Sequence, residues 1–145
     1  MKALLQRVSR ASVSVDDQCI GRIGSGLLVL VGVEKEDDDA TLDKMLHRLT
    51  HYRVFSDENG RMNVNVLDHG GELLLVSQFT LVADTSRGLR PGFSHGATPE
   101  HGYAIFKKMV EKARALGVHV ETGKFGADMQ VALVNDGPVT FMLEA

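Results

Sequence analysis

The sequence predicts a single α+β domain, in which a curled mixed β-sheet or barrel-like core carries two main helices. Strand-like apolar runs clearly outnumber helical ones, and 15 glycines lie scattered between them as turn residues do. The helices are too few to cover both faces of a doubly wound parallel sheet. No repeat or linker divides the chain, so we expect one domain over residues 1–145.

The first part of the chain is typical of three strands. Residues 3–15 alternate loosely between apolar and polar side chains and end at the turn signal Asp16-Asp17. Residues 19–23 and 27–33 follow, separated by the turn sequence GSG. The segment 27–33 (LLVLVGV) is apolar on both faces, which predicts a place in the centre of a covered sheet.

Two amphipathic helices are expected, at about residues 38–51 and 99–116. In the first, leucine and methionine recur at i, i+3, i+4 and i+7 after a run of aspartates that suits the positive end of a helix dipole. The second has Thr98 as N-cap, Pro99 at its first position and Gly117 as its stop. Both helices therefore have one apolar face to pack against a sheet.

The remaining apolar runs are strand-like and cover residues 72–82, 118–121, 129–134 and 139–143. Between the last two lies NDGPVT (135–140), whose composition favours a hairpin turn. Cis X-Pro bonds are rare in folded proteins, so the pattern alone does not predict one there.

A polar cluster interrupts the apolar run 72–82. If that run is one strand, Gln78 and Thr80 share a face. Buried polar groups without partners are costly, so the cluster indicates either a lined cleft or hydrogen bonds to neighbouring loops. The pattern leaves both interpretations open.

Composition argues against several classes of protein. With 16 Lys and Arg against 19 Asp and Glu, the net charge of -3 speaks against a general nucleic-acid coat protein. The longest apolar run is too short for a membrane span, and the N-terminal residues lack a signal-peptide pattern. The single Cys19 fits a reducing compartment, so we expect a cytoplasmic protein with no membrane partner.

The common catalytic motifs are missing. No phosphate loop, dinucleotide fingerprint or nucleophile elbow occurs. His47 and His51 stand four residues apart on a predicted helix, so both could reach one metal ion. The Glu of H-E-x-x-H is missing and no third ligand is obvious, so a solvated helix face is the competing interpretation.

Two segments, SQFTL (77–81) and NDGPVT, carry a family resemblance. They resemble the two signature motifs of the D-aminoacyl-tRNA deacylases, also known as D-tyrosyl-tRNA deacylases. Further similar segments are MKALLQRVSRASV, GLLVLVGVEK, YRVFSDENGRMN, DTSRGLRPGFS and FGADMQVALVNDGPVTF. They follow one another in order, so the resemblance spans essentially the whole chain.

The resemblance implies a homodimer that hydrolyses the ester between a D-amino acid, or mischarged glycine, and the terminal adenosine of tRNA. This is a proofreading reaction, and it implies no cofactor and no metal. The expected partners are the 3′ end of aminoacyl-tRNA and a second copy of the chain, with no DNA.

It also implies an active site at the subunit interface, to which one subunit contributes the catalytic segment Ser77, Gln78, Phe79 and Thr80. The backbone N–H groups of Phe79 and Thr80 are candidate donors to the oxyanion. A nucleophile needs a base within hydrogen-bond reach, and the motif contains no His, Asp or Glu. We therefore expect Thr80 to position the reacting groups rather than to attack.

The partner subunit would contribute Gly137 and Pro138, joined by a cis bond and held in place by Arg7. Backbone carbonyls of this loop would hold the substrate ammonium and exclude the side chain of an L-residue. Phe125 and Met129 would line the pocket for the terminal adenine.

A few local cations are candidates for contact with the RNA end: Arg87, Arg90, Lys107, Lys108 and Lys124. Because the chain is acidic overall, we expect a small RNA interface and a shallow salt dependence of binding. A non-catalytic module that binds the tRNA 3′ end is the alternative function, and a metal-dependent hydrolase using His47 and His51 is a third.

Overall fold

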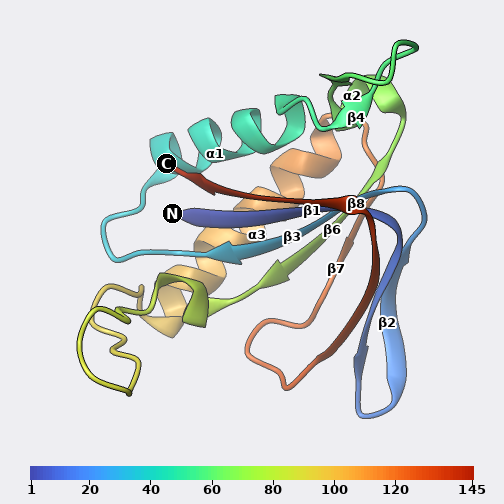
Figure 1. Cartoon of the computed structure of the whole chain (residues 1–145). Coiled ribbons are helices and arrows are strands. Elements are labelled where there is room, and N and C mark those ends of the chain that lie inside the picture. The colour runs from blue at the N-terminus through green and yellow to red at the C-terminus, as the bar shows by residue number, and fades with distance from the viewer.

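The structure, a computed structural model, describes residues 1–145. The first strand, β1 (Lys2–Val15), pairs with three other strands and organises the sheet (Figure 1). One edge of β1 pairs antiparallel with β8 (Gln130–Glu144). The other edge pairs antiparallel with β3 (Gly26–Gly32) in its first half and with β2 (Gln18–Ile23) in its second half. Register shifts in the β1–β8 pair bend both strands, which curls the sheet.

The other half of the sheet is parallel. β3 pairs with β6 (Glu72–Ser77), and β6 pairs with β7 (Val120–Thr122). The connections contain α1 (Asp39–His51), a short α2 (Val66–His69) and α3 (Pro99–Ala115). A two-stranded hairpin, β4 (Phe55–Ser56) with β5 (Met62–Val64), lies between α1 and α2. The predicted mixed, barrel-like α+β sheet with two main helices is confirmed, and no helix is both long and apolar enough to cross a bilayer.

Alternation along β3 divides the core between two sides of the sheet. Leu27, Val29 and Val31 pack under α1 and α3 in the larger apolar cluster. Leu28 lies in a second cluster on the other side, with residues of β1, β2 and β6. A strand buried on both faces is apolar throughout, as the segment LLVLVGV is.

The two main helices begin where their caps predict. The Asp38 carboxylate accepts a hydrogen bond from the Thr41 N–H (2.9 Å), and the Thr98 hydroxyl accepts one from the His101 N–H (3.2 Å). Such bonds satisfy N–H groups that a helix start leaves unpaired. The short α2 and the β4–β5 hairpin were not predicted, because neither has enough residues for a periodic pattern.

Two predictions in the strand-rich part are wrong. The run 72–82 is a strand only to Ser77 and then becomes a 3-10 helix, Phe79–Val82. NDGPVT is no hairpin turn, because β8 runs through it: Asn135 lies opposite Val8 and Thr140 opposite Gln6. The residues between them bulge out of the ladder instead of reversing the chain. The predicted strand 118–121 lies slightly later, at Val120–Thr122.

A buried ion pair joins the start of β1 to the segment before α1. The ammonium group of Met1 lies 2.6 Å from Glu34 Oε1 and 3.0 Å from Asp37 Oδ1. Asp37 is buried, and its other oxygen accepts the Glu34 N–H at 2.7 Å. The ammonium also donates to the Ala145 carbonyl at 3.1 Å, so this cluster ties both ends of the chain together.

Candidate active site

The parallel strands β3, β6 and β7 bring their carboxyl ends to one edge of the sheet. Two segments named by the sequence follow those ends: 77–81 after β6 and 123–129 after β7. The Gly123 N–H donates to the Leu75 carbonyl at 3.2 Å, which ties the second segment to β6. This edge is where open parallel sheets place their ligands.

Ser77 ends β6 opposite Val31, and the chain turns sharply after it. The Gln78 N–H still donates to the Val31 carbonyl (2.8 Å), and the Leu81 N–H donates to the Gln78 carbonyl (3.1 Å). The Gln78 amide donates through Nε2 to Thr80 Oγ1 at 2.6 Å. Gln78 and Thr80 are thus brought together by a helical turn and not by strand alternation.

The N–H groups of Phe79 and Thr80 donate no hydrogen bond within the chain. They stand at the start of the 3-10 helix, where the first donors have no helical acceptor. The Phe79 side chain is 67% exposed, and its ring contacts Phe93 at a ring-centroid distance of 5.3 Å. Two free donors beside an exposed aromatic ring are able to bind an oxyanion next to a planar group.

The hydroxyl of Thr80 has an amide as its hydrogen-bond partner. An amide is not a base, so this contact holds the hydroxyl in place without activating it for attack.

Phe125 and Met129 lie in the loop between β7 and β8. The Phe125 ring meets Tyr103 edge-on at 5.4 Å and lies close to Gly102, where an added Cβ would be 3.4 Å from Cζ. Met129 packs against the second apolar cluster, and its sulfur would be 2.6 Å from a Cβ at Gly123. Glycine at position 123 therefore makes room for Met129, whereas a Cβ at position 102 would meet Phe125 at ordinary contact distance.

Gly137 and Pro138 lie in the bulge of β8, are exposed, and are joined by a cis peptide bond. Arg7 lies next to this loop. Its Nε donates a hydrogen bond to the Asp136 carbonyl (2.8 Å), and its Nη1 donates one to the Val54 carbonyl (2.7 Å). The guanidinium thus links the loop to the segment before β4.

Asn135 is a further residue of this loop, to which the sequence analysis assigned no role. Its Oδ1 accepts the Val139 N–H at 2.6 Å, and its Nδ2 donates to Thr140 Oγ1 at 2.9 Å. The side chain closes the base of the bulge from within. The tendency of Asn to bond to nearby backbone groups is the signal that would have identified it.

Within one chain, the predicted catalytic segment and the Gly-Pro loop lie apart. β1 and β3 stand between β8 and β6, so three strand spacings of about 4.8 Å, about 14 Å in all, separate the two strands. The two segments also lie at different positions along the strands. Strand pairing aligns Thr140 with Gln6, Leu28 and Leu74 across the sheet, and Leu74 lies three residues before Ser77. Hence neither Gly137 nor Pro138 reaches Thr80 in the same chain.

The predicted RNA-contact cations differ in their pairing. Lys108 forms an ion pair with Asp39 at 3.0 Å, whereas Arg87, Arg90, Lys107 and Lys124 form none. Four of the five candidates thus keep their charge free for an anionic ligand.

The metal-site alternative at His47 and His51 lacks a ligand set. The two rings stack on the exposed face of α1 at 4.2 Å, and His51 Nδ1 lies 2.9 Å from the His47 carbonyl. No group of three His, Cys, Asp or Glu side chains is placed to hold a metal ion. His47 and His51 are exposed, as the competing interpretation of a solvated helix face predicts.

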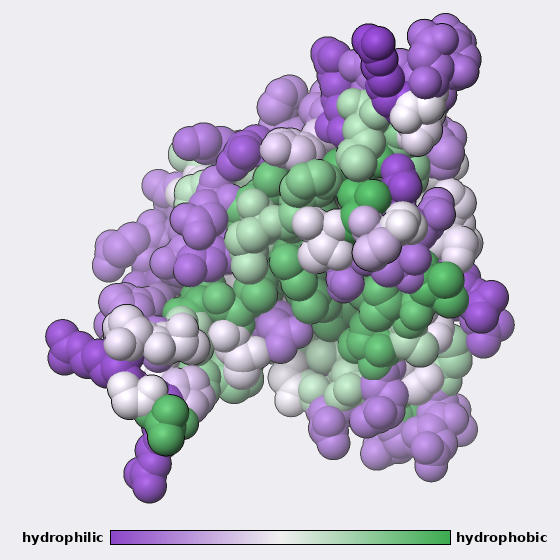
Figure 2. All heavy atoms as spheres, viewed as in Figure 1, coloured by the Kyte–Doolittle hydropathy of each residue, from purple (hydrophilic) through white to green (hydrophobic).

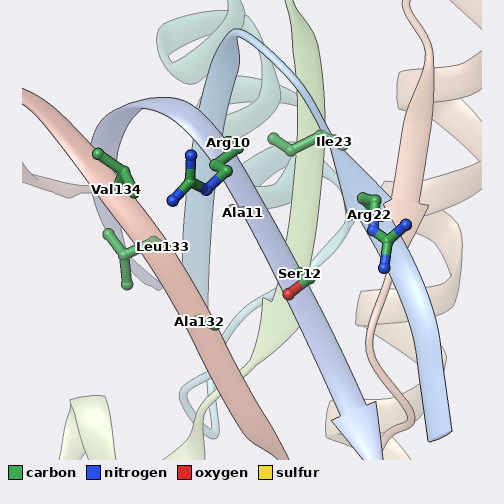
Figure 3. A pocket seen from close by; sticks show the side chains of 8 residues that line it. All are labelled: Arg10, Ala11, Ser12, Arg22, Ile23, Ala132, Leu133 and Val134. Atoms are coloured by element: carbon green, nitrogen blue, oxygen red, sulfur yellow. The ribbon is translucent and has the colours of Figure 1, made fainter.

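A groove of about 210 Å³ crosses β1, β2 and β8, but none of the predicted site residues lines it (Figure 3). Arg10, Ser12 and Arg22 lie beside small and apolar side chains there, and the two guanidinium groups do not converge on one point. The predicted site residues therefore lie at the edge of the sheet and not in this groove.

Comparison with known proteins identifies relatives that match nearly the whole chain. The family model described as D-Tyr-tRNA(Tyr) deacylase matches residues 4–144. A D-aminoacyl-tRNA deacylase of Alteromonas mediterranea is 64% identical over 97% of each chain, and one of Salmonella typhimurium is 56% identical over 99% of each.

Solved structures show the same fold. A c-Myc DNA unwinding element binding protein superposes with a TM-score of 0.95 at 40% identity, over 100% of this chain and 99% of that one. A probable eukaryotic D-amino acid tRNA deacylase gives a TM-score of 0.89 at 17% identity, over 99% and 98%, which shows the fold alone. Because the match covers nearly the whole chain at high identity, this protein belongs to the D-Tyr-tRNA(Tyr) deacylase family.

Proposed function

We propose that this protein removes D-amino acids from tRNA by hydrolysing the ester to the terminal adenosine, with mischarged glycyl-tRNA as a second substrate. The observation that carries the proposal is the full-length match to a family of D-aminoacyl-tRNA deacylases, which are hydrolases. The alternative function is a non-catalytic module that binds the tRNA 3′ end through the same residues but does not hydrolyse the ester. We place the reaction in the cytoplasm, since an exposed unpaired thiol at Cys19 suits a reducing compartment.

The active site of this proposal forms between two copies of the chain. The strands that carry its two halves are about 14 Å apart within one copy, so in this proposal a second copy supplies the Gly-Pro loop opposite Thr80. The outer edge of β8 pairs with no strand, and Val134, Phe141 and Met142 are exposed along it. Long exposed edges with apolar side chains are normally covered, which supports a homodimer built through this strand.

Chiral selection in this site works by exclusion. Backbone carbonyls of the loop at Gly137 and Pro138 accept hydrogen bonds from the substrate ammonium, which fixes the Cα. The side chain of an L-residue then points into the loop, and that of a D-residue points away from it. Glycine has no side chain to exclude, so it passes the same filter.

Hydrolysis needs an attacking water and donors for the charge that develops on the carbonyl oxygen. We assign the donor role to the N–H groups of Phe79 and Thr80, which have no acceptor within the chain. Gln78 and Thr80 hold each other through their 2.6 Å hydrogen bond and position this turn. Phe125 and Met129 bind the terminal adenine, whose ribose 2′-hydroxyl lies next to the ester and is able to assist the reaction.

The test is a deacylation assay with D-Tyr-tRNA and L-Tyr-tRNA, under single-turnover conditions and with or without EDTA. We expect rapid loss of the D-ester, survival of the L-ester and no effect of the chelator. Equal rates on the two esters would contradict chiral selection. No hydrolysis despite tight tRNA binding would favour the non-catalytic module, and inhibition by EDTA would favour a metal-dependent hydrolase.

A further inference from the structure

Residues 84–92 form a projecting loop, here called the arm, with a fixed base. Asp84 and Gly92 exchange two backbone hydrogen bonds, at 2.8 and 2.9 Å. The Asp84 carboxylate also accepts the Ser86 N–H at 2.9 Å, which shapes the first turn. Beyond the arm, the Ala97 N–H donates to the Val33 carbonyl at 3.0 Å, so the exit is held at the end of β3.

The arm is positioned by the catalytic turn. It begins directly after the 3-10 helix that carries Thr80, and Phe93, the residue after its base, packs on Phe79 at 5.3 Å. In Figure 1 it is the yellow-green loop that extends beyond the edge of the sheet. Anything bound at Phe79 and Thr80 therefore lies beside the base of the arm.

The tip of the arm has no role in the fold. Leu89 is fully exposed at 103%, and no hydrogen bond or ion pair joins residues 87–91 to any other part of the chain. Arg87 and Arg90 flank the leucine, and no acidic residue occurs between 85 and 94. In a chain of net charge -3 this segment carries two unpaired positive charges. Figure 2 shows the corresponding corner as strongly hydrophilic atoms around one hydrophobic patch.

We propose that the arm binds the RNA next to the aminoacylated end of tRNA, with Arg87 and Arg90 on backbone phosphates and Leu89 against the face of a base. The inference rests on the proposed function, which places the RNA terminus at Phe79 and Thr80. Guanidinium groups match phosphate oxygens in pairs, and an exposed apolar side chain between them is suited to a base face. A second copy of the chain is the competing occupant, but two unpaired cations favour a polyanion over an apolar protein surface.

The experiment measures the Kd for tRNA without an attached amino acid, by filter binding at salt concentrations between about 0.05 and 0.5 M. Phosphate contacts weaken strongly over this range. The test variant is R87Q/R90Q, and the matched control is K44Q/R61Q, which removes two exposed, unpaired cations elsewhere. Each lost phosphate contact lowers the slope of log K against log salt by about 0.7, so the test variant loses about 1.4 in slope and roughly 25-fold in affinity at 0.1 M. The control keeps the wild-type slope.

A second variant separates the apolar contact from the charges. We expect L89S to weaken tRNA binding several-fold at every salt concentration, with an unchanged slope, because no counterion is released by a leucine. Thermal unfolding of all variants should match wild type, since the tip packs against nothing. In kinetics, the R87Q/R90Q loss on D-Tyr-tRNA should exceed its loss on the D-Tyr ester of adenosine, which has no phosphates.

Three results would overturn the arm proposal. They are a wild-type slope for R87Q/R90Q, equal losses for test and control variants, or a lower sedimentation coefficient of the arm variants, which would assign the tip to a second copy. Failure of the proposed function is a different result, namely no hydrolysis of D-Tyr-tRNA by the wild-type protein.

Discussion

Replacing Thr80 by valine distinguishes a positioning residue from a nucleophile. The substitution keeps the shape of the side chain and removes Oγ1, whose contact is the 2.6 Å hydrogen bond from Gln78 Nε2. One such bond contributes about 0.5–1.5 kcal/mol net, which corresponds to about a two- to twelvefold loss in rate. Removing a true nucleophile costs about 10⁴- to 10⁶-fold. The two roles therefore differ by about three orders of magnitude or more.

The assay is single-turnover hydrolysis of D-Tyr-tRNA with enzyme in excess. We expect Thr80→Val to lose no more than about tenfold, and Thr80→Ser, which keeps the hydroxyl, to stay close to wild type. Gln78→Leu removes the other half of the pair and should lose a similar amount. Because the two side chains act through one contact, the double variant should lose less than the sum of the two single variants.

The reasoning would be refuted by a loss of about 10⁴-fold or more in Thr80→Val, with unchanged thermal unfolding and tRNA binding. Trapping of an acyl-enzyme on the wild-type protein would refute it independently.

Three further predictions concern other parts of the molecule. Arg7→Met removes the hydrogen bonds by which the guanidinium links Asp136 of the Gly-Pro loop to Val54, so the ratio of rates on D- and L-Tyr-tRNA should fall, with partial retention in Arg7→Lys. An unchanged ratio would contradict the positioning role. Asp37→Asn leaves the buried Met1 ammonium with only one carboxylate. It should lower the free energy of unfolding by about 3 kcal/mol in urea titrations. A decrease below about 1 kcal/mol would contradict a stabilising role for this ion pair. The Thr41 N–H and hydroxyl donate hydrogen bonds to the Asp38 carboxylate and hold its pKa below the ordinary value. Asp38 therefore stabilises α1 above about pH 4, and this stabilisation is lost as the pH falls through the lowered pKa. Asp38→Asn should reduce the dependence of the free energy of unfolding on pH in this acidic range.

The local sequence determined the elements whose stabilising contacts lie within a few residues. Both main helices were predictable from apolar spacing, from the aspartate run before the first and from the Thr98 cap of the second, because these contacts span three or four positions. The segment 27–33 was predictable as a central strand because burial on two faces requires apolar side chains throughout. The segment 77–81 was visible as an interruption of an apolar run, although its backbone was not.

Tertiary structure decided the shape of the candidate site. The turn after Ser77 is fixed by the Gln78 N–H bonding to Val31, far away in the sequence, and no local pattern encodes that acceptor. NDGPVT has the composition of a hairpin, yet pairing with β1 on both sides keeps it in one strand and forces a bulge. Arg7 reaches its loop across 129 positions, and Tyr103 meets Phe125 through the packing of α3.

The sequence by itself thus determined the fold class, the main helices and, through its motifs, the family of this protein. Only the tertiary structure decided that the two motifs lie on strands separated by β1 and β3. The physical reason is that strand order depends on hydrogen bonds between residues distant in the chain, which leave no periodic trace in the residues themselves. That separation is the observation on which we propose that a second copy of the chain completes the active site.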